Sequence, residues 1–83
     1  MNKVLIDVFV PNIDEHYNIF IPINKRINTI KRSIVQSIGE LLEDNTFENL
    51  TFNMYDSETG LKFDDNVYVK DSGIKNGSKI ILI

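Results

Sequence analysis

One segment of this chain, residues 27–43, repeats its apolar residues at the three-to-four spacing of an amphipathic helix. The apolar stripe consists of Ile27, Ile30, Ile34, Ile38 and Leu41, with Val35 and Leu42 at its margin. Such a helix must bury its stripe against another element, and the other apolar runs of the chain are typical of strands. The sequence therefore predicts a two-layer α+β domain in which one helix packs on one sheet.

Short runs rich in β-branched and aromatic residues lie on both sides of that helix and predict the strands. These runs are residues 4–10, 17–21, 51–55, 61–63 and 79–83. They give the order β-β-α-β-β-β and a mixed sheet of four to five strands. Asn24 is the best helix N-cap by residue type, residues 44–49 are predicted to form a loop, and one 3₁₀ turn is expected near Asp71. In the first strand, alternation directs Val8 and its neighbours two apart into the core and directs Phe9 away from it.

Composition and charge exclude several classes of function. The chain of 83 residues is long enough for one small domain, which we expect to span residues 1–83. It has no Cys and a single His, His16, which excludes thiol catalysis, iron–sulfur clusters and multi-histidine metal sites. The net charge of −3 argues against broad nucleic-acid binding. The residues form no phosphate-binding loop or EF-hand pattern, so we predict no enzyme, no cofactor and no metal site.

The first residues carry no targeting signal. Their apolar run is interrupted by Asp7, whereas a signal peptide needs a longer unbroken stretch. No run approaches the roughly 18 apolar residues of a transmembrane helix. We therefore expect a cytoplasmic protein that does not insert directly into a membrane.

The chain resembles the ubiquitin-like β-grasp domains in its element order and in residues 69–80, VKDSGIKNGSKI. Those domains carry a similar string, in which an apolar residue and Asp precede Gly-Ile, a second Gly and an apolar final strand. By this resemblance, Ile74 fills the core and Asn76-Gly77 turns the chain into the central strand. The opening run with Asp7, the short length and the segment SGIKNGSKI are most similar to the YukD family, small bacterial ubiquitin-like proteins associated with type VII (WXG100/ESX) secretion.

The resemblance implies a non-catalytic, non-conjugated interaction module, an accessory or regulatory component of a type VII secretion system, peripheral to its membrane complex. The partner would be a protein of that machine, and a homodimer stays open. The alternative is a protein modifier or sulfur carrier. Proteins of those two kinds act through a protruding C-terminal Gly-Gly. Here the last residue is Ile83, which we expect inside the final strand. A β-grasp adaptor in another pathway is the third possibility.

Apolar residues on the sheet face away from the helix form the main candidate interface, because exposed apolar patches often mark binding sites. The candidates are Leu5, Phe9, Phe20, Tyr55, Ile81 and Ile83. Ubiquitin's receptors use the same face. Asn53 stands where the resemblance places an apolar patch residue of ubiquitin, so we do not expect ubiquitin receptors to bind.

Bases gather at the start of the helix and acids at its end, which opposes the helix macrodipole. We take Lys25, Arg26 and Arg32 as a secondary basic patch for an acidic partner or anionic lipid, with tolerated surface charge as the alternative. Lys31 lies about 40° from Ile27 on the helical wheel, inside the apolar stripe. By resemblance to ubiquitin, its ammonium is expected to pair with Asp64 or Asp65.

Overall fold

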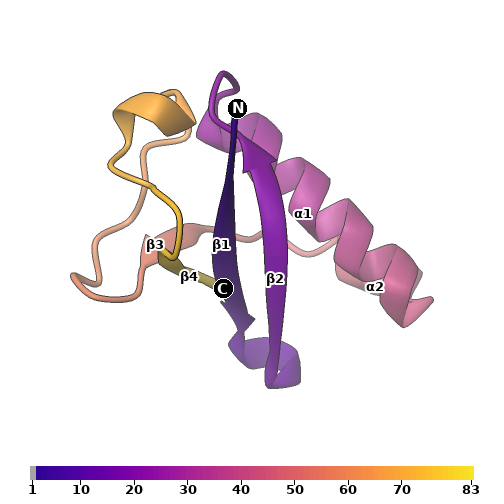
Figure 1. Cartoon of the computed structure of the whole chain (residues 1–83). Coiled ribbons are helices and arrows are strands. Elements are labelled where there is room, and N and C mark those ends of the chain that lie inside the picture. The colour runs from indigo at the N-terminus through magenta and orange to yellow at the C-terminus, as the bar shows by residue number, and fades with distance from the viewer. Residues whose placement is uncertain (1) are drawn as a thin grey trace.

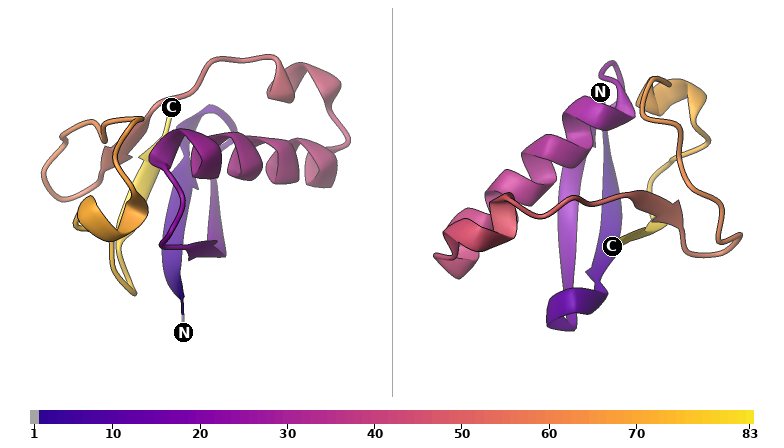
Figure 2. Two further views of the ribbon diagram at one scale, coloured as in Figure 1. Left: turned by 90° about the horizontal axis from the view of Figure 1, so that it is seen from above. Right: turned by 180° about the vertical axis from the view of Figure 1, so that it is seen from behind.

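A computed structural model describes residues 2–83 and contains a mixed four-stranded sheet with one long helix across one face (Figures 1 and 2). The elements in chain order are β1 (Lys3–Val10), a 3₁₀ turn (Pro11–Ile13), β2 (Glu15–Pro22), α1 (Ile27–Leu42), α2 (Asn45–Glu48), β3 (Met54–Asp56), a second 3₁₀ turn (Val69–Asp71) and β4 (Lys79–Leu82). The strands are ordered β2-β1-β4-β3, with only β1 and β4 parallel. The predicted ubiquitin-like β-grasp fold is confirmed.

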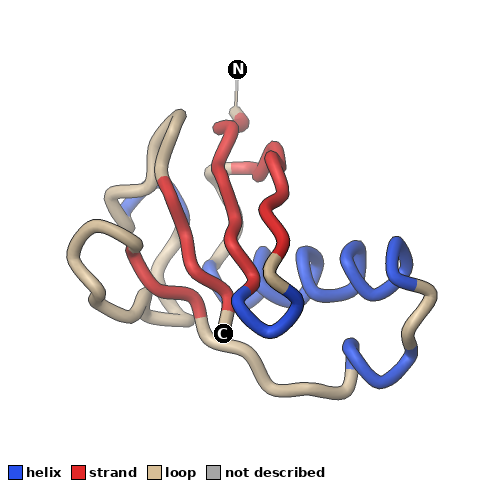
Figure 3. Tube along the Cα trace, turned by 90° about the horizontal axis from the view of Figure 1, so that it is seen from below, coloured by secondary structure: helices blue, strands red, loops and turns tan. Residues whose placement is uncertain are grey.

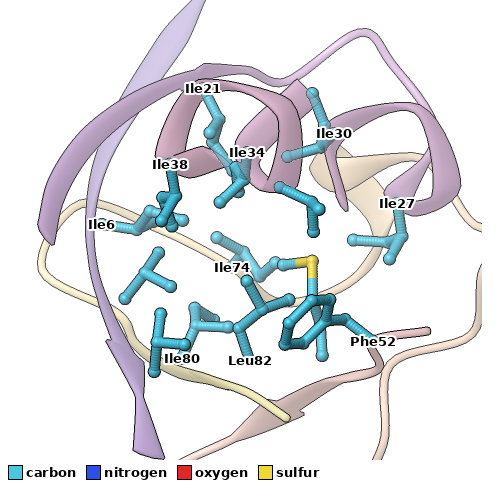
Figure 4. Close-up of a cluster of buried hydrophobic side chains, with 14 of the residues drawn as sticks. Ile6, Ile21, Ile27, Ile30, Ile34, Ile38, Phe52, Ile74, Ile80 and Leu82 are labelled. Atoms are coloured by element: carbon cyan, nitrogen blue, oxygen red, sulfur yellow. The ribbon is translucent and has the colours of Figure 1, made fainter. Parts of the chain in front are cut away.

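The core lies between α1 and the face of the sheet formed by alternate residues of each strand (Figure 4). In β1 the buried residues are Ile6, Val8 and Val10, as the alternation predicts. Ile74 is buried beneath the helix, so its predicted position in the core is confirmed. Each fully buried aliphatic side chain contributes about 1.5–3 kcal/mol through the hydrophobic effect, and this shared core fixes which sheet face stays open.

The hairpin of β1 and β2 is tighter than predicted. β2 begins at Glu15 rather than at Tyr17, because the 3₁₀ turn and Asp14 reverse the chain in four residues. Asp14 adopts the left-handed conformation, with φ of 52°. The eight residues of β1 then pair with the eight of β2 without a bulge, from Lys3 opposite Pro22 to Val10 opposite Glu15.

The start of α1 is capped by distant backbone rather than by a local side chain, so the predicted N-cap at Asn24 is wrong. The N-cap is Arg26, whose side chain makes no capping hydrogen bond. The backbone N–H groups of Ile27 and Asn28 instead donate to the carbonyls of Val67 and Asp65, at 2.9 and 3.0 Å. A loop about 40 positions later in the chain thus satisfies two donors that every helix start leaves open.

The end of α1 differs from the prediction in two ways. The helix stops at Leu42 because Glu43 turns left-handed, and the expected loop that follows contains the short helix α2, which buries Phe47. Leu41, predicted in the core stripe, is 72% exposed. The reason is geometric: the C-terminal part of α1 extends beyond β2, the edge strand, so no strand lies beneath it (Figures 2 and 3).

The other edge of the sheet is shorter and is covered by a loop. β3 spans only Met54–Asp56, and the predicted strand at residues 61–63 is an extended segment with a single bridge, Lys62 to Tyr55. Its backbone still bonds to β3, since Phe63 N–H donates to Met54 and Asp56 N–H donates to Leu61, both at 2.9 Å. The 3₁₀ turn predicted near Asp71 is present.

Candidate protein-binding surface

The sheet face opposite α1 carries one row of apolar and aromatic side chains that crosses all four strands. Phe9 of β1 lies opposite His16 of β2 and beside Ile81 of β4, and Ile81 lies opposite Tyr55 of β3. The rings of Phe9 and His16 are stacked, with centroids 4.5 Å apart and planes inclined by 24°. We name His16, Phe9, Ile81 and Tyr55 the aromatic row. The sequence missed His16, because the prediction placed it in the turn rather than in β2.

The two remaining residues of the predicted interface on β1 and β2 form a separate cluster. Leu5 pairs with Phe20, and Phe20 is 60% exposed. Asp7, Asn18 and Lys79 form a polar row between this Leu5–Phe20 cluster and the aromatic row. Since Leu5 and Phe9 are four residues apart on one strand, their Cα atoms are about 13 Å apart. The expected single patch is therefore two patches in the monomer.

The last predicted interface residue, Ile83, is held at the end of the sheet. Its N–H donates to the carbonyl of Asn53 at 3.0 Å, and its own carbonyl accepts from the N–H of Asn53 at 2.8 Å. The side chain of Ile83 is half exposed. Its position continues the open face beyond the aromatic row.

His16 makes a second contact besides its stacking on Phe9. Its Nδ1 lies 3.2 Å from Oδ1 of Asp7. The pair is exposed, so it contributes little to stability. The two contacts place the His16 ring against Phe9 and beside Asp7, at the β2 end of the aromatic row.

The three residues of the predicted basic patch lie in different surroundings. Lys25 lines a groove between β2 and α1, and Arg32 lines a hollow on the opposite side of α1. Arg26 stacks its guanidinium over the ring of Tyr68, 5.4 Å from the centroid, and Lys70 approaches the same ring at 5.7 Å. The sequence pattern did not reveal this aromatic contact, because Tyr68 is more than 40 residues away in the chain.

Among the described residues, 2–83, no three His, Cys, Asp or Glu side chains are grouped to hold a metal ion. Within the same residues, no helix has the length and apolarity needed to cross a bilayer. The open sheet face is partly apolar and carries large side chains on a hydrogen-bonded sheet.

No protein-family model matches this sequence, and no curated protein matches it. Solved structures do match in fold. The ubiquitin-like domain of the Mycobacterium tuberculosis type VII secretion system protein EccD1 superposes with a TM-score of 0.75 at 14% identity, covering 100% of this chain and 99% of that one. The EccD5 ubiquitin-like domain from Mycobacterium xenopi gives 0.79 at 9% identity, covering 100% and 94%.

Two further matches show the breadth of the fold. A chain of the ESX-5 inner membrane complex matches with a TM-score of 0.74 at 10% identity, and this protein covers 21% of that chain. The ubiquitin-like domain of an Arabidopsis thaliana protein matches with 0.69 at 18% identity, covering 100% of this chain and 78% of that one. At these identities the likeness shows the fold, which secretion proteins and plant proteins share.

Proposed function

We propose that this chain is a non-catalytic, non-conjugated ubiquitin-like interaction module that acts as an accessory or regulatory component of a bacterial type VII secretion system, as the YukD family does. The observation that carries the proposal is the match over the whole chain to the EccD1 and EccD5 ubiquitin-like domains, which belong to such systems. The match to a chain of the ESX-5 inner membrane complex supports a protein partner within a membrane assembly. The module would then work in the cytoplasm, peripheral to that assembly.

The aromatic row is the surface through which the module docks. Phe9 and Tyr55 are large side chains held on a rigid backbone, and aromatic anchors of this kind dominate binding energy at interfaces. Ile81 lies between them, so the three form one continuous contact area, and Ile83 extends it. The bases at the start of α1 point elsewhere and would at most change the association rate and its salt dependence.

The test replaces one residue on each surface. We choose Phe9→Lys rather than an acid because Asp7 lies two positions away on the same face and would repel a carboxylate. The matched variant is Arg32→Glu, on the far side of the molecule. Once both variants are shown to fold, the gene for each replaces the wild-type gene in a host strain. The secretion of WXG100 substrates by that strain is then measured.

Phe9→Lys should abolish the contribution of the module to secretion and its capture of the purified membrane complex, whereas Arg32→Glu should behave as wild type at physiological salt. Normal secretion and binding by Phe9→Lys together with failure of Arg32→Glu would place the docking site on the helix. Normal secretion in a strain that lacks the gene would exclude the secretion role itself.

A further inference from the structure

The edge strand β2 presents an open row of backbone hydrogen-bonding groups. The N–H of Asp7 donates to Ser78 and the carbonyl of Leu5 accepts from Gly77, so the odd residues of β1 bond toward β4. The even residues of β1 therefore bond toward β2, and their partners are the odd residues of β2. The backbone groups of His16, Asn18 and Phe20 consequently point to the outer edge, where β2 has no neighbour among the described strands.

The central part of this edge, residues 16–20, lacks the devices that usually prevent strand pairing, since Glu15 and Pro22 stand only at its two ends. Edge strands are commonly blunted by a lysine, a bulge or a covering loop. β2 contains no Lys or Arg and pairs with β1 over eight unbulged residues. The opposite edge of the sheet is protected, since residues 61–63 cover β3. The contrast within one sheet leaves the β2 edge open to pairing with a further strand.

A second, independent feature points to the same place. Leu41 lies about 20° from Ile34 on the helical wheel, yet Ile34 is buried and Leu41 is 72% exposed. The apolar stripe of α1 is longer than the sheet it covers, and its uncovered part lies beyond β2 (Figure 2). Between β2 and α1 runs a groove of about 250 Å³ whose apolar lining includes Ile19 and Ile21. A further strand at the β2 edge would extend the sheet beneath the overhanging helix.

We propose that this strand is β2 of a second copy, paired antiparallel to the first about a two-fold axis at Asn18. The register follows from which groups are available. Placing Asn18 opposite its own copy and His16 opposite Phe20 uses every outward N–H and carbonyl of these three residues on both chains. A shift by two residues would place His16 opposite Pro22, which has no N–H to donate to the His16 carbonyl, so that hydrogen bond would be lost on both chains.

The same register joins the two apolar patches of the monomer. Phe20 lies opposite His16 of the second copy, and His16 is already stacked on Phe9. The row on the open face then runs without a polar break from Leu5 and Phe20 of one chain into the aromatic row of the other. Two such rows arise by symmetry, and neither is covered by the pairing, so this inference is independent of the docking proposed above.

Charge complementarity favours a second copy over an unrelated strand. Among the described residues, Lys25 is the only charged one that lines the groove, which Ile21 also lines. Glu15 has the same orientation on β2 as Ile21 and is exposed. In the proposed register Glu15 lies opposite Ile21 of the second copy, which brings its carboxylate to Lys25 of that copy. The two-fold axis creates this ion pair twice.

The test uses charge reversal on both sides of the pair. Wild type, Glu15→Lys, Lys25→Glu and the double variant are measured by analytical ultracentrifugation over a concentration series, with Lys62→Glu as a charge-matched control on the covered edge. Wild type and Lys62→Glu should dimerise, while Glu15→Lys alone and Lys25→Glu alone should each form a homodimer at least roughly tenfold more weakly at low salt. The double variant should dimerise again, and an equimolar mixture of the two single variants should form a heterodimer.

A covalent test fixes the register. The chain contains no Cys, so Asn18→Cys introduces one thiol at the two-fold axis. Directly opposed Cα atoms of a hydrogen-bonded pair are about 5.5 Å apart, within the range of a disulfide. Mild oxidation should cross-link this variant far faster than Thr59→Cys, an exposed control in the β3 loop. The proposal is overturned if the wild-type chain stays monomeric up to its solubility limit. It is also overturned if the single charge variants dimerise as well as wild type. In either case the β2 edge would be available to a strand of another protein.

Discussion

The Nζ of Lys31 in α1 lies 3.0 Å from Oδ1 of Asp65 in the loop before the second 3₁₀ turn. The lysine side chain is only 15% exposed, so its methylenes pack against the core while the ammonium reaches the carboxylate at the surface. Of the two acids that the sequence left open, Asp65 is therefore the partner. The contact ties the helix to the same loop whose carbonyls cap its first turn.

Removing Asp65 should destabilise the protein more than removing Lys31. Asp65→Ala leaves the ammonium of a mostly buried lysine side chain without its acceptor, which should lower the free energy of unfolding by about 1–3 kcal/mol. Lys31→Met keeps the packing and removes the charge, so its cost should stay below about 1 kcal/mol. Urea unfolding of both variants measures the difference, with the exposed loop substitution Glu58→Ala as control. Equal losses for the two would mean that the pair acts only through its mutual attraction.

Two residues of one helical stripe should differ strongly in what their truncation costs. Ile38→Ala opens a cavity in the core and should cost about 2–5 kcal/mol. Leu41→Ala removes a side chain that is 72% exposed, so it should change the stability of the monomer by less than about 0.5 kcal/mol. Both are measured by urea unfolding in dilute solution, where association does not contribute. A large loss for Leu41→Ala there would show that the side chain is buried within one chain.

A single side chain in the last turn secures the central strand pair. Oδ1 of Asn76 accepts a hydrogen bond from the backbone N–H of Leu5 at 2.8 Å, and the N–H of Gly77 donates to the Leu5 carbonyl at the same distance. Asn76→Ala should therefore cost about 0.5–1.5 kcal/mol in thermal or urea unfolding. Asn24→Ala, at the position wrongly expected to cap α1, should cost less than about 0.5 kcal/mol. A larger loss for Asn24→Ala than for Asn76→Ala would contradict both the Asn76–Leu5 hydrogen bond and the backbone capping of α1.

Asp44 should titrate below the ordinary value of 3.8, because hydrogen bonds from the Thr46 hydroxyl, and next from the Thr46 backbone N–H, lower the pKa of its carboxyl. The folded state thus binds this proton more weakly than the unfolded state does. The stabilising contribution is present above the unfolded pKa and is lost as the pH falls through the folded one.

The Asp44 titration can be followed by NMR of its carboxyl carbon. Thr46→Val removes the hydroxyl, the largest cause, and should raise the Asp44 pKa toward 3.8. Thr29→Val, the same substitution in α1 and far from Asp44, should leave the Asp44 titration unchanged. If Thr46→Val leaves the Asp44 pKa unchanged, the Thr46 hydroxyl is not the cause of the lowered pKa.

Local pattern was enough to predict the architecture. The spacing of Ile27, Ile30, Ile34 and Ile38 defines one buried helical stripe, and the alternation in β1 defines which face of the sheet meets it. The candidate interface followed from the same alternation, since six residues were assigned to the face that no helix covers. These predictions rest on the periods of side-chain direction, about 3.6 residues in a helix and 2 in a strand, which can be read directly from the sequence.

The sequence by itself determined the long helix, the main strands and their buried faces, and its resemblance to ubiquitin-like domains indicated the β-grasp fold. The tertiary structure decided how far each element is covered by its neighbours, where the short elements α2 and β3 form, and which distant backbone groups cap the helix start. The helical spacing places Leu41 in line with the buried residues of α1, but Leu41 lies beyond the edge strand β2. The spacing of apolar residues carries no information about the width of the sheet. The helix start is capped by Asp65 and Val67, and the face predicted as one patch is split by Asp7, Asn18 and Lys79, because strand register places them in one row. Such relations arise only when segments far apart in the chain meet in space.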